Sequence, residues 1–496
     1  MAYHTGRTVT TLASVCRLKL AIFQCHNPQC PRFQHPYRPE EEGAWALPHG
    51  EFGLDVIAHI GLLRYRHHRS VPEIHRDLHE RRIAIAPRTV TDLLARYEEL
   101  VALHLADQTR LQERLAQQGH VILAIDGLQP YKSQDILWVL RDCLSGEVLL
   151  ARSLDSAREA DLAGLLREVK QALPVPIHAV ISDGQRTIRL AVQTVVPDVP
   201  HQLCQFHYLK ETAKPIVEAD SQAKTVLKKY VRGIRPIEHA LGERDDPDAE
   251  ALRAYCQAVR SALTDTGHPP LQLPGLLLHD RLTAIHASLE RVGRKKGLPD
   301  ELADLQRVLE TGLFASAQHW DRLRTAHSWV VRAAQILENH AQADAATVEA
   351  TYRQLLSDVL THQSDRELEP FATNFYKVSR SYWHGLFHCY DMPDLPRTNN
   401  ALEQYFGSVR HQERRATGRK SPTSAVVVRG SVRVVAAVAT HLTEFDAADL
   451  RLRDPARWRQ LRQDLEARHE ARRAQRRFRR DPAAYLAQLE ARLCSL

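Results

Sequence analysis

The stretch VILAIDGLQP, residues 121–130, sets an apolar run directly against the carboxylate of Asp126. The run has the composition of a buried strand, and an Asp-Gly pair follows it at once. A second stretch, AVISDGQ at residues 179–185, repeats the arrangement with Asp183. Each Asp-Gly pair could form a turn, because both residue types favour turn conformations. Two such pairs after neighbouring strands instead predict two carboxylates in one region of a sheet.

The residues around these stretches alternate between strand and helix patterns. ILWVLRDCLSGEVLLARSL, residues 136–154, has the pattern of two strands joined at Ser-Gly. EADLAGLLREVKQAL, residues 159–173, places its leucines and its valine on one helix face, and residues 186–196 predict a further helix. Strands followed by helix, strand and helix predict an α/β domain with a mixed sheet over residues 116–210.

A third carboxylate, Glu403, lies in the stretch TNNALEQ, residues 398–404. Asn400 could cap a helix here, with Glu403 three residues later as its capping-box partner. The first turn of a helix also carries partial positive charge, which favours an anion. Carboxylates that lie close together repel one another and persist when a cation shares them, and hard oxygen ligands select Mg²⁺ or Mn²⁺. We therefore predict one metal site formed by Asp126, Asp183 and Glu403.

The chain resembles the Asp-Asp-Glu transposases with a ribonuclease H-like core, because it contains Asp126, Asp183 and a distant Glu403 in this order. After the second Asp, the stretch CQFHYLKE contains Cys204 and His207 in a Cys-x-x-His spacing. This spacing is similar to the signature of Mutator-like transposases and of related transposases of bacterial insertion sequences. The long helical pattern between the second Asp and the Glu is similar to theirs as well.

The resemblance is strong over residues 120–210 and 396–420 and loose in the insertion at 211–395. It implies a ribonuclease H-like catalytic core, interrupted by this large all-α insertion and completed by residues 396–450 with the helix of Glu403. It also implies that two Mg²⁺ (or Mn²⁺) ions clamp the scissile phosphate, one activating a nucleophile and the other stabilising the leaving oxygen. The Cys-x-x-His pair would have a structural or DNA-positioning role near the site.

Residues 1–42 show little periodic structure, and residues 1–45 are predicted to be a zinc-binding segment. This segment contains Cys25 and Cys30 on either side of an Asn-Pro turn. Two thiolates at this spacing can share a zinc ion. The remaining ligands would come from Cys16, His35, His26 or His4. The alternative is a loop whose thiols are neighbours without a metal. The other cysteines are scattered, which is typical of a protein in a reducing compartment.

Residues 46–115 predict a helix-turn-helix domain. SVPEIHRDLHER, residues 70–81, opens with a capping box of Ser70 and Glu73. PRTVTDLLARYEELVALH, residues 87–104, begins with a proline suited to a first helical turn. The second helix of such a pair enters the major groove. It would bring Arg88, Thr89 and Thr91 to base edges and phosphates. The alternative is a plain helical hairpin.

The positive charge of the chain is concentrated near its end. Lys and Arg number 67 against 60 acidic residues, a net charge of +7, with an isoelectric point near 9.0. Residues 451–480 alone contain 12 Arg against 4 acidic residues, a local net charge of +8. A basic tail at 451–496 indicates a polyanionic partner, with nucleic acid as the first candidate; the alternative is a solvated charged helix. Phosphate contacts are also predicted for Arg410, Arg414, Arg415, Arg419 and Lys420.

A chain of 496 residues is too long for one core, so we expect two to four domains. It shows no signal peptide and no apolar run approaching the roughly 18 residues that span a membrane. We expect a cytoplasmic, nucleoid-associated protein.

The predicted function is that of a DNA transposase. It would bind double-stranded DNA at element ends, act as a homo-oligomer on that DNA, and catalyse metal-dependent strand cleavage and strand transfer. One alternative is a zinc and helix-turn-helix regulator with an inactive nuclease-like domain, but the three acids argue against a decayed site. Another is a structure-specific nuclease without strand transfer, although a DNA-reading region favours an enzyme that recognises its own ends. Inverted repeats flanking the gene would favour the transposase.

Overall fold

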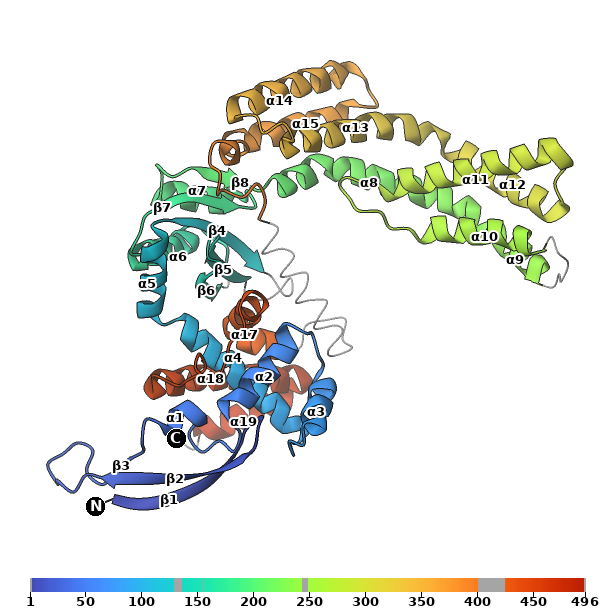
Figure 1. Cartoon of the computed structure of the whole chain (residues 1–496). Helices are drawn as coiled ribbons and strands as arrows, with labels where there is room; N and C mark the ends of the chain where they lie inside the picture. The colour runs from blue at the N-terminus through green and yellow to red at the C-terminus, as the bar shows by residue number, and fades with distance from the viewer. Residues whose placement is uncertain (1, 129–135, 155, 243–248, 400–423, 495–496) are drawn as a thin grey trace. The chain divides into compact units, whose positions relative to one another are not determined.

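The computed structural model describes residues 2–128, 136–154, 156–242, 249–399 and 424–494. These residues form two compact units (Figure 1). Unit 1 consists of residues 1–180, 185–199 and 399–496, and unit 2 consists of residues 181–184 and 200–398. Each unit buries hydrophobic clusters of its own.

Unit 1 begins with a two-stranded ribbon. Strand β1 (Ala2–Thr10) pairs antiparallel with β2 (Val15–Gln24) along its whole length, and the short β3 (Pro36–Tyr37) pairs with the end of β2. The prediction that residues 1–42 have little periodic structure is therefore wrong. Apolar and charged side chains alternate through RLKLAI in β2, and this period of two is the strand signal.

Helices follow the ribbon. They are α1 (Glu42–Trp45), α2 (Leu54–Tyr65), α3 (Val71–Glu80), α4 (Pro87–Leu105) and α5 (Gln108–Gln118). Helices α3 and α4, joined by residues 81–86, are the two helices that the sequence predicts. The capping box is confirmed, because the Ser70 side chain accepts from the Glu73 backbone while the Glu73 carboxylate accepts from the Ser70 N–H. Helix α4 begins at Pro87 and buries its apolar stripe in a core shared with α2 and α3.

A mixed five-stranded sheet comes next, in the order β6-β5-β4-β7-β8. Its strands are β4 (Val121–Leu128), β5 (Ile136–Asp142), β6 (Val148–Leu154), β7 (Ile177–Ser182) and β8 (His201–Leu203). Strand β5 is antiparallel to both β4 and β6. The N–H of Val121 donates to the carbonyl of Pro176 at 3.0 Å, so β4 and β7 begin at the same edge and run in the same direction.

Two helices cover one face of this sheet. Helices α6 (Glu159–Ala172) and α7 (Arg186–Val195) bury their apolar residues in one cluster with β4, β5 and β7. The predicted mixed α/β fold is thereby confirmed.

The C-terminal helices return to the N-terminal ones. They are α17 (Ser424–Leu442), α18 (Pro455–Arg480) and α19 (Pro482–Cys494). Alanines of α17 and Trp458 of α18 lie in the same core as α2, α3 and α4. The hydroxyl groups of Tyr97 and Thr440, 343 positions apart, are hydrogen-bonded at 2.7 Å. The predicted basic tail is therefore a helix whose beginning is packed.

Unit 2 is helical after β8. Its α-helices are α8 (Gln205–Val231), α9 (Arg235–Gly242), α10 (Ala249–Thr264), α11 (Pro274–Lys296), α12 (Asp300–Ser316), α13 (Trp320–Glu338), α14 (Ala345–Leu360) and α15 (Glu369–Tyr382). Its 3₁₀ turns are Arg232–Ile234, Ala317–His319, Thr361–Ser364, Trp383–Gly385 and His388–Tyr390. As far as residues 209–395 are described, they contain no strand, in agreement with the helical pattern of the sequence.

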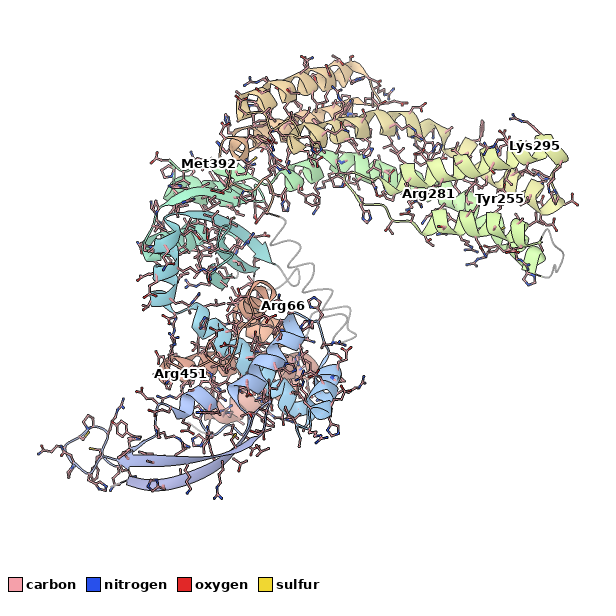
Figure 2. All side chains as sticks on the ribbon, viewed as in Figure 1. Arg66, Tyr255, Arg281, Lys295, Met392 and Arg451 are labelled. Atoms are coloured by element: carbon pink, nitrogen blue, oxygen red, sulfur yellow. The ribbon has the colours of Figure 1, made fainter. Side chains whose placement is uncertain are left out.

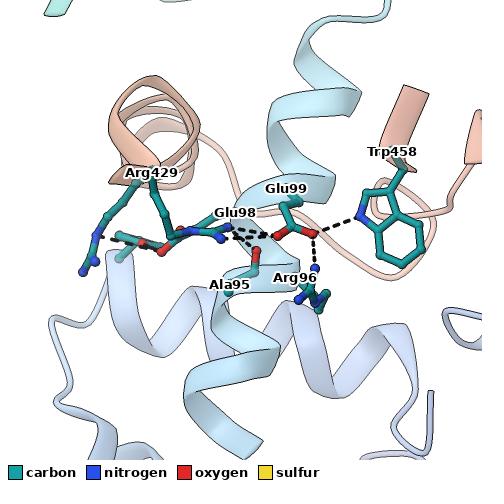
Figure 3. A network of polar contacts seen from close by, with 8 residues as sticks. Ala95, Arg96, Glu98, Glu99, Arg429 and Trp458 are labelled. Carbon is teal, nitrogen blue, oxygen red and sulfur yellow. Dashed lines mark hydrogen bonds and ion pairs between the residues drawn. The ribbon is translucent and has the colours of Figure 1, made fainter. Parts of the chain in front are cut away.

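A buried ion-pair network fastens α4 to α17 and α18 (Figure 3). Glu98 and Glu99 are each only 2% exposed, and both contact the guanidinium of Arg429. The same guanidinium donates to the carbonyl of Ala95 at 2.6 Å. The indole N–H of Trp458 donates to Glu99 Oε2 at 3.0 Å. Two carboxylates that would be very costly to bury alone are thus held by donors from two other helices.

Further donors to Glu98 and Glu99 come from α2 and from α4 itself. Arg96 Nη1 lies 2.5 Å from Glu99 Oε2, and the Tyr65 hydroxyl donates to Glu98 Oε1 at 2.5 Å. Burial and the neighbouring Glu98 raise the pKa of Tyr65 well above its usual range, so the phenol keeps its proton and remains a donor. Burial opposes the charge of Arg429, but Glu98 and Glu99 outweigh this effect and raise its pKa. The Arg429 guanidinium therefore stays charged at any ordinary pH.

Replacing Arg429 by Ala should destabilise unit 1 by about 3–5 kcal/mol, because two buried carboxylates lose their shared cation. The measurement is urea unfolding of the full chain, read as a loss in the free energy of unfolding. Arg152→Ala is the matched control, since Arg152 pairs with Glu168 on the surface of the same unit with the two side chains 47% and 48% exposed. It should cost about 0–1 kcal/mol. Equal effects of the two variants would contradict the central role of Arg429.

Candidate functional site

Asp126 lies inside β4 and not in a turn after it. It pairs with Val139 of β5, and the strand continues through Gly127. Its Oδ1 accepts from the Gly127 N–H at 2.8 Å, and the residue is 7% exposed. A Cβ added at Gly127 would come within 3.1 Å of the Trp138 ring, so glycine makes room for packing at this point. The interpretation of this Asp-Gly pair as a turn is therefore wrong.

Asp183 directly follows β7, where the chain leaves the sheet. Here the Asp-Gly pair does turn, because Gly184 has a φ of 86°, a conformation that favours glycine. The hydroxyl of Tyr382 donates to the carbonyl of Asp183 at 3.0 Å. Ser182 Oγ and His201 Nε2 are hydrogen-bonded at 2.8 Å. The half-buried Asp183 side chain thus stands on a turn that unit 2 holds in place.

The sheet order makes β4 and β7 neighbours, as a pair of carboxylates on adjacent strands requires. The third predicted ligand, Glu403, lies outside the described residues, and so does its proposed cap Asn400. The same holds for the predicted phosphate contacts Arg410, Arg414, Arg415, Arg419 and Lys420. Within the part of the chain that the structure describes, no three His, Cys, Asp or Glu side chains gather in a way that could hold a metal ion.

One residue that the sequence analysis missed lies shortly before Glu403 in the chain and is hydrogen-bonded to the sheet. Asn399, only 1% exposed, donates from Nδ2 to the carbonyl of Ile125 at 3.3 Å. Ile125 immediately precedes Asp126, so the segment that contains Glu403 starts from an anchor on β4. The sequence signal for this contact is the Asn-Asn pair of TNNALEQ, whose second residue, Asn400, is the predicted helix cap.

Cys204 and His207 lie where the chain enters α8. The backbone N–H of Cys204 donates to the carbonyl of Ser182 at 2.8 Å, which ties the start of α8 to the end of β7. The Cys204 side chain is fully buried, and His207 is half-buried in the first turn of the helix. Gln205, which follows Cys204, donates from its side chain to the carbonyl of Leu386 at 2.9 Å. This position beside the Asp183 turn fits the structural role that the resemblance implies.

A buried tyrosine cluster supports the Asp183 turn from within unit 2. The hydroxyl of Tyr208 is hydrogen-bonded to Tyr352 at 2.5 Å and to Ser379 at 2.6 Å. Its ring centroid lies 5.5 Å from that of Tyr382, whose hydroxyl holds the Asp183 backbone. Burial raises the pKa of Tyr208, so this hydroxyl stays neutral. The sequence gives no local signal for such a cluster, because its members come from three helices.

The N-terminal end of α4 carries the predicted DNA-reading residues. Arg88 and Thr91 are exposed and Thr89 is half-buried, while Thr91 Oγ donates to the carbonyl of Pro87 at 3.2 Å. The other half of the same helix is held by the network of Glu98 and Glu99. A rigidly held helix with an exposed polar end is an arrangement that DNA reading can use.

The Arg-rich segment forms α18 after Asp454, whose Oδ1 accepts from two backbone N–H groups of its first turn. Within α18, Trp458 and Leu465 are buried, and most of the arginines are exposed. Arg451, labelled in Figure 2, marks the beginning of the Arg-rich segment. The distribution of charge around this helix is suited to binding a polyanion without a fixed geometry.

The predicted zinc ligands do not all come together. Cys16 is the second residue of β2 and Cys25 follows its last, so roughly 30 Å of extended strand separates them. Cys16 is therefore wrong as a ligand of the same ion. Cys25 and Cys30 remain in one loop, where the Cys30 N–H donates to Asn27 and the Cys25 carbonyl accepts from Gln34. His35 ends this loop, and a zinc ion bound to Cys25, Cys30 and His35 stays a prediction.

No protein-family model matches the chain. A search of curated proteins gives no match either. The resemblance to transposases therefore rests on the sequence motifs alone. Among the described helices, none is both long and apolar enough to cross a lipid bilayer.

If Cys25 and Cys30 bind zinc, the purified full chain should contain about one zinc ion, because a loop of this size without a core needs such a ligand set to hold it. Metal analysis of a Cys25→Ser/Cys30→Ser variant should show the metal lost. Cys16→Ser is the matched control and should keep it, because Cys16 lies at the other end of β2. Metal lost equally in both variants would place the ion elsewhere.

Proposed function

We propose that this chain is a DNA transposase that cleaves and joins DNA strands with divalent metal ions held by Asp126, Asp183 and Glu403. The observation that carries the proposal is the position of the two aspartates: Asp126 lies on β4, and Asp183 directly follows β7. These strands are adjacent and begin at the same edge of one mixed sheet. The antiparallel strands β5 and β6 lie beyond β4, which agrees with the ribonuclease H-like core that the resemblance implies.

Chain connectivity supports the third ligand. Asn399 is hydrogen-bonded to Ile125, next to Asp126. Glu403 follows Asn399 by four residues, and four residues of fully extended chain reach at most about 14 Å. The segment therefore starts close enough to β4 for Glu403 to join the two aspartates.

The donor set fits hard divalent cations. Three carboxylates offer only oxygen ligands, which suit Mg²⁺ or Mn²⁺. Asp126 is nearly buried, and a buried carboxylate is best tolerated where a cation shares its charge. Such ions, when bound, activate a water or a DNA 3′-hydroxyl and stabilise the leaving oxygen. The carboxylates hold and space the ions, and the Asp183 turn is fixed by Tyr382 so that its side chain needs little reorganisation.

The two other functions make different demands. A DNA-binding regulator would have no use for Asp126, a nearly buried acid inside a strand, in place of an apolar residue. A structure-specific nuclease would share the metal site but would not join strands. A joined product made from a pre-cleaved end and a target duplex therefore distinguishes the transposase from the nuclease.

Asp126→Asn should abolish metal-dependent cleavage of element-end DNA and leave binding to that DNA nearly unchanged, because the amide keeps the shape and loses the charge that holds the metal. Cleavage is measured with Mg²⁺ on labelled duplex, and binding is measured without metal. Asp198→Asn is the control, since Asp198 is an exposed acid of the same unit after α7. Normal cleavage by the Asp126 variant would remove the proposed site.

We expect α4 to supply sequence preference and α18 to supply affinity. Deleting residues 451–496 should weaken binding to element-end and random duplex by similar factors and flatten the salt dependence. Since the start of α18 is packed in the core, Ala substitution of Arg476, Arg477, Arg479 and Arg480 is the gentler version of the same test. Arg88→Ala should instead narrow the gap between the two DNAs by about 1–3 kcal/mol. The roles of α4 and α18 would be reversed if neutralising the tail arginines removed the preference for element-end DNA while Arg88→Ala left that preference intact.

A further inference from the structure

The N-terminal ribbon has an unusual charge. The sequence contains no Asp or Glu before Glu40. The cations of this segment are Arg7, Arg17, Lys19, Arg32 and Arg38. Neither α4 nor α18 includes any of these residues, so a second source of positive charge is present in unit 1.

The two faces of the ribbon differ. One face is turned toward the residues that follow it, where Arg7 Nη1 donates to the carbonyls of Leu47 and Gly50, both at 3.0 Å. Arg7 Nη2 lies 3.0 Å from the carboxylate of Glu42, which also pairs with Arg38. The cations of this inner face are thus engaged within the protein.

The outer face is open. Arg17 and Lys19 on β2 are exposed, as are His4 and Thr8 on β1. Arg17 lies across from Thr8, and Lys19 lies across from Gly6. The Nε of Arg17 is 3.4 Å from where a Cβ on Gly6 would stand, so glycine leaves space for the guanidinium. Phe23 is 58% exposed on the same face. We call His4, Thr8, Arg17, Lys19 and Phe23 the outer ribbon face.

We propose that the outer ribbon face binds duplex DNA by entering its major groove. A major groove about 12 Å wide admits a two-stranded ribbon, whose strands lie roughly 4.8 Å apart. Nine paired residues extend roughly 30 Å, close to one helical turn of DNA. Arg17 and Lys19 would contact phosphates, while Thr8 and His4 offer hydrogen bonds to base edges. The inference takes DNA as the partner from the proposed function and does not depend on the metal site.

The shape and charge of this face favour duplex DNA over other polyanions. The major groove of double-stranded RNA is too deep and narrow for side chains to read. A single strand would bind best to aromatic side chains placed at successive bases. The outer ribbon face has Phe23 at one end, across from the exposed Tyr37 of β3, and cations along its middle. It therefore matches the backbone spacing of a groove better than a row of stacked bases.

The test is the binding of full-length Arg17→Ala/Lys19→Ala protein to a random 30-base-pair duplex, measured by fluorescence anisotropy over a range of salt concentrations. If both cations contact phosphates, the slope of log K against log salt should fall by roughly 1.8, since each contact contributes about 0.9. The matched control is Lys295→Ala/Lys296→Ala, which removes equal charge from exposed positions at the end of α11 (Figure 2). It should leave the slope unchanged. Arg17→Lys/Lys19→Arg keeps both charges and should bind like the wild type, which separates lost contacts from altered folding.

Three results would overturn the proposal. One is an unchanged slope in the Arg17/Lys19 variant, and another is an equal fall in the control. The third is an equal loss of affinity for a single strand with the same number of phosphates, which would make the face a general polyanion surface. The measurement is made without metal and without cleavage, so it stands or fails separately from the Asp126→Asn experiment.

Discussion

The contact of Glu98 and Glu99 with Arg429 is the constraint on which unit 1 depends. Two adjacent carboxylates on α4 are almost completely buried, and such a pair is tolerated only with compensating donors. Arg429 comes from α17 and Trp458 from α18, while Tyr65 comes from α2. The network therefore requires that the C-terminal helices reach α4 before the N-terminal helical domain is stable. The helix predicted to read DNA and the helix after the predicted catalytic segment form one structural element.

This constraint also acts on the predicted metal site. The segment that contains Glu403 begins at Asn399, which is bonded to β4 beside Asp126, and leads to α17, which Arg429 ties to α4. Both ends of the segment are thus attached within unit 1. The other end of α4 carries Arg88. Ion pairs and packed side chains therefore join the helix predicted to read DNA to the helix that follows the Glu403 segment.

Local patterns in the sequence predicted the local parts of this structure. The capping box of Ser70, the start of α4 at Pro87 and the α/β order around Asp126 all depend on residues a few positions apart. The ribbon was not predicted, because Cys25 and Cys30 beside Asn-Pro indicate a loop, whereas the strand signal is confined to the alternation in β2. Contacts such as Asn399 with Ile125 could not be predicted, because they join residues 274 positions apart and depend on tertiary packing.

Three elements of unit 1 are proposed to contact DNA, namely α4, α18 and the N-terminal ribbon. They differ in how much of each is packed against the rest of the unit. Helix α18 buries Trp458 and Leu465 but exposes most of its arginines, so it would give affinity with little orientation. Helix α4 is held by buried ion pairs and can present Arg88 at a fixed angle. The ribbon is held by its inner face, where Arg7 is hydrogen-bonded to the backbone of Leu47 and Gly50, while its outer face, which carries Arg17 and Lys19, is exposed. If both bind DNA, two packed elements on one unit would fix position and direction along a duplex, which contacts from the exposed arginines of α18 alone would not do.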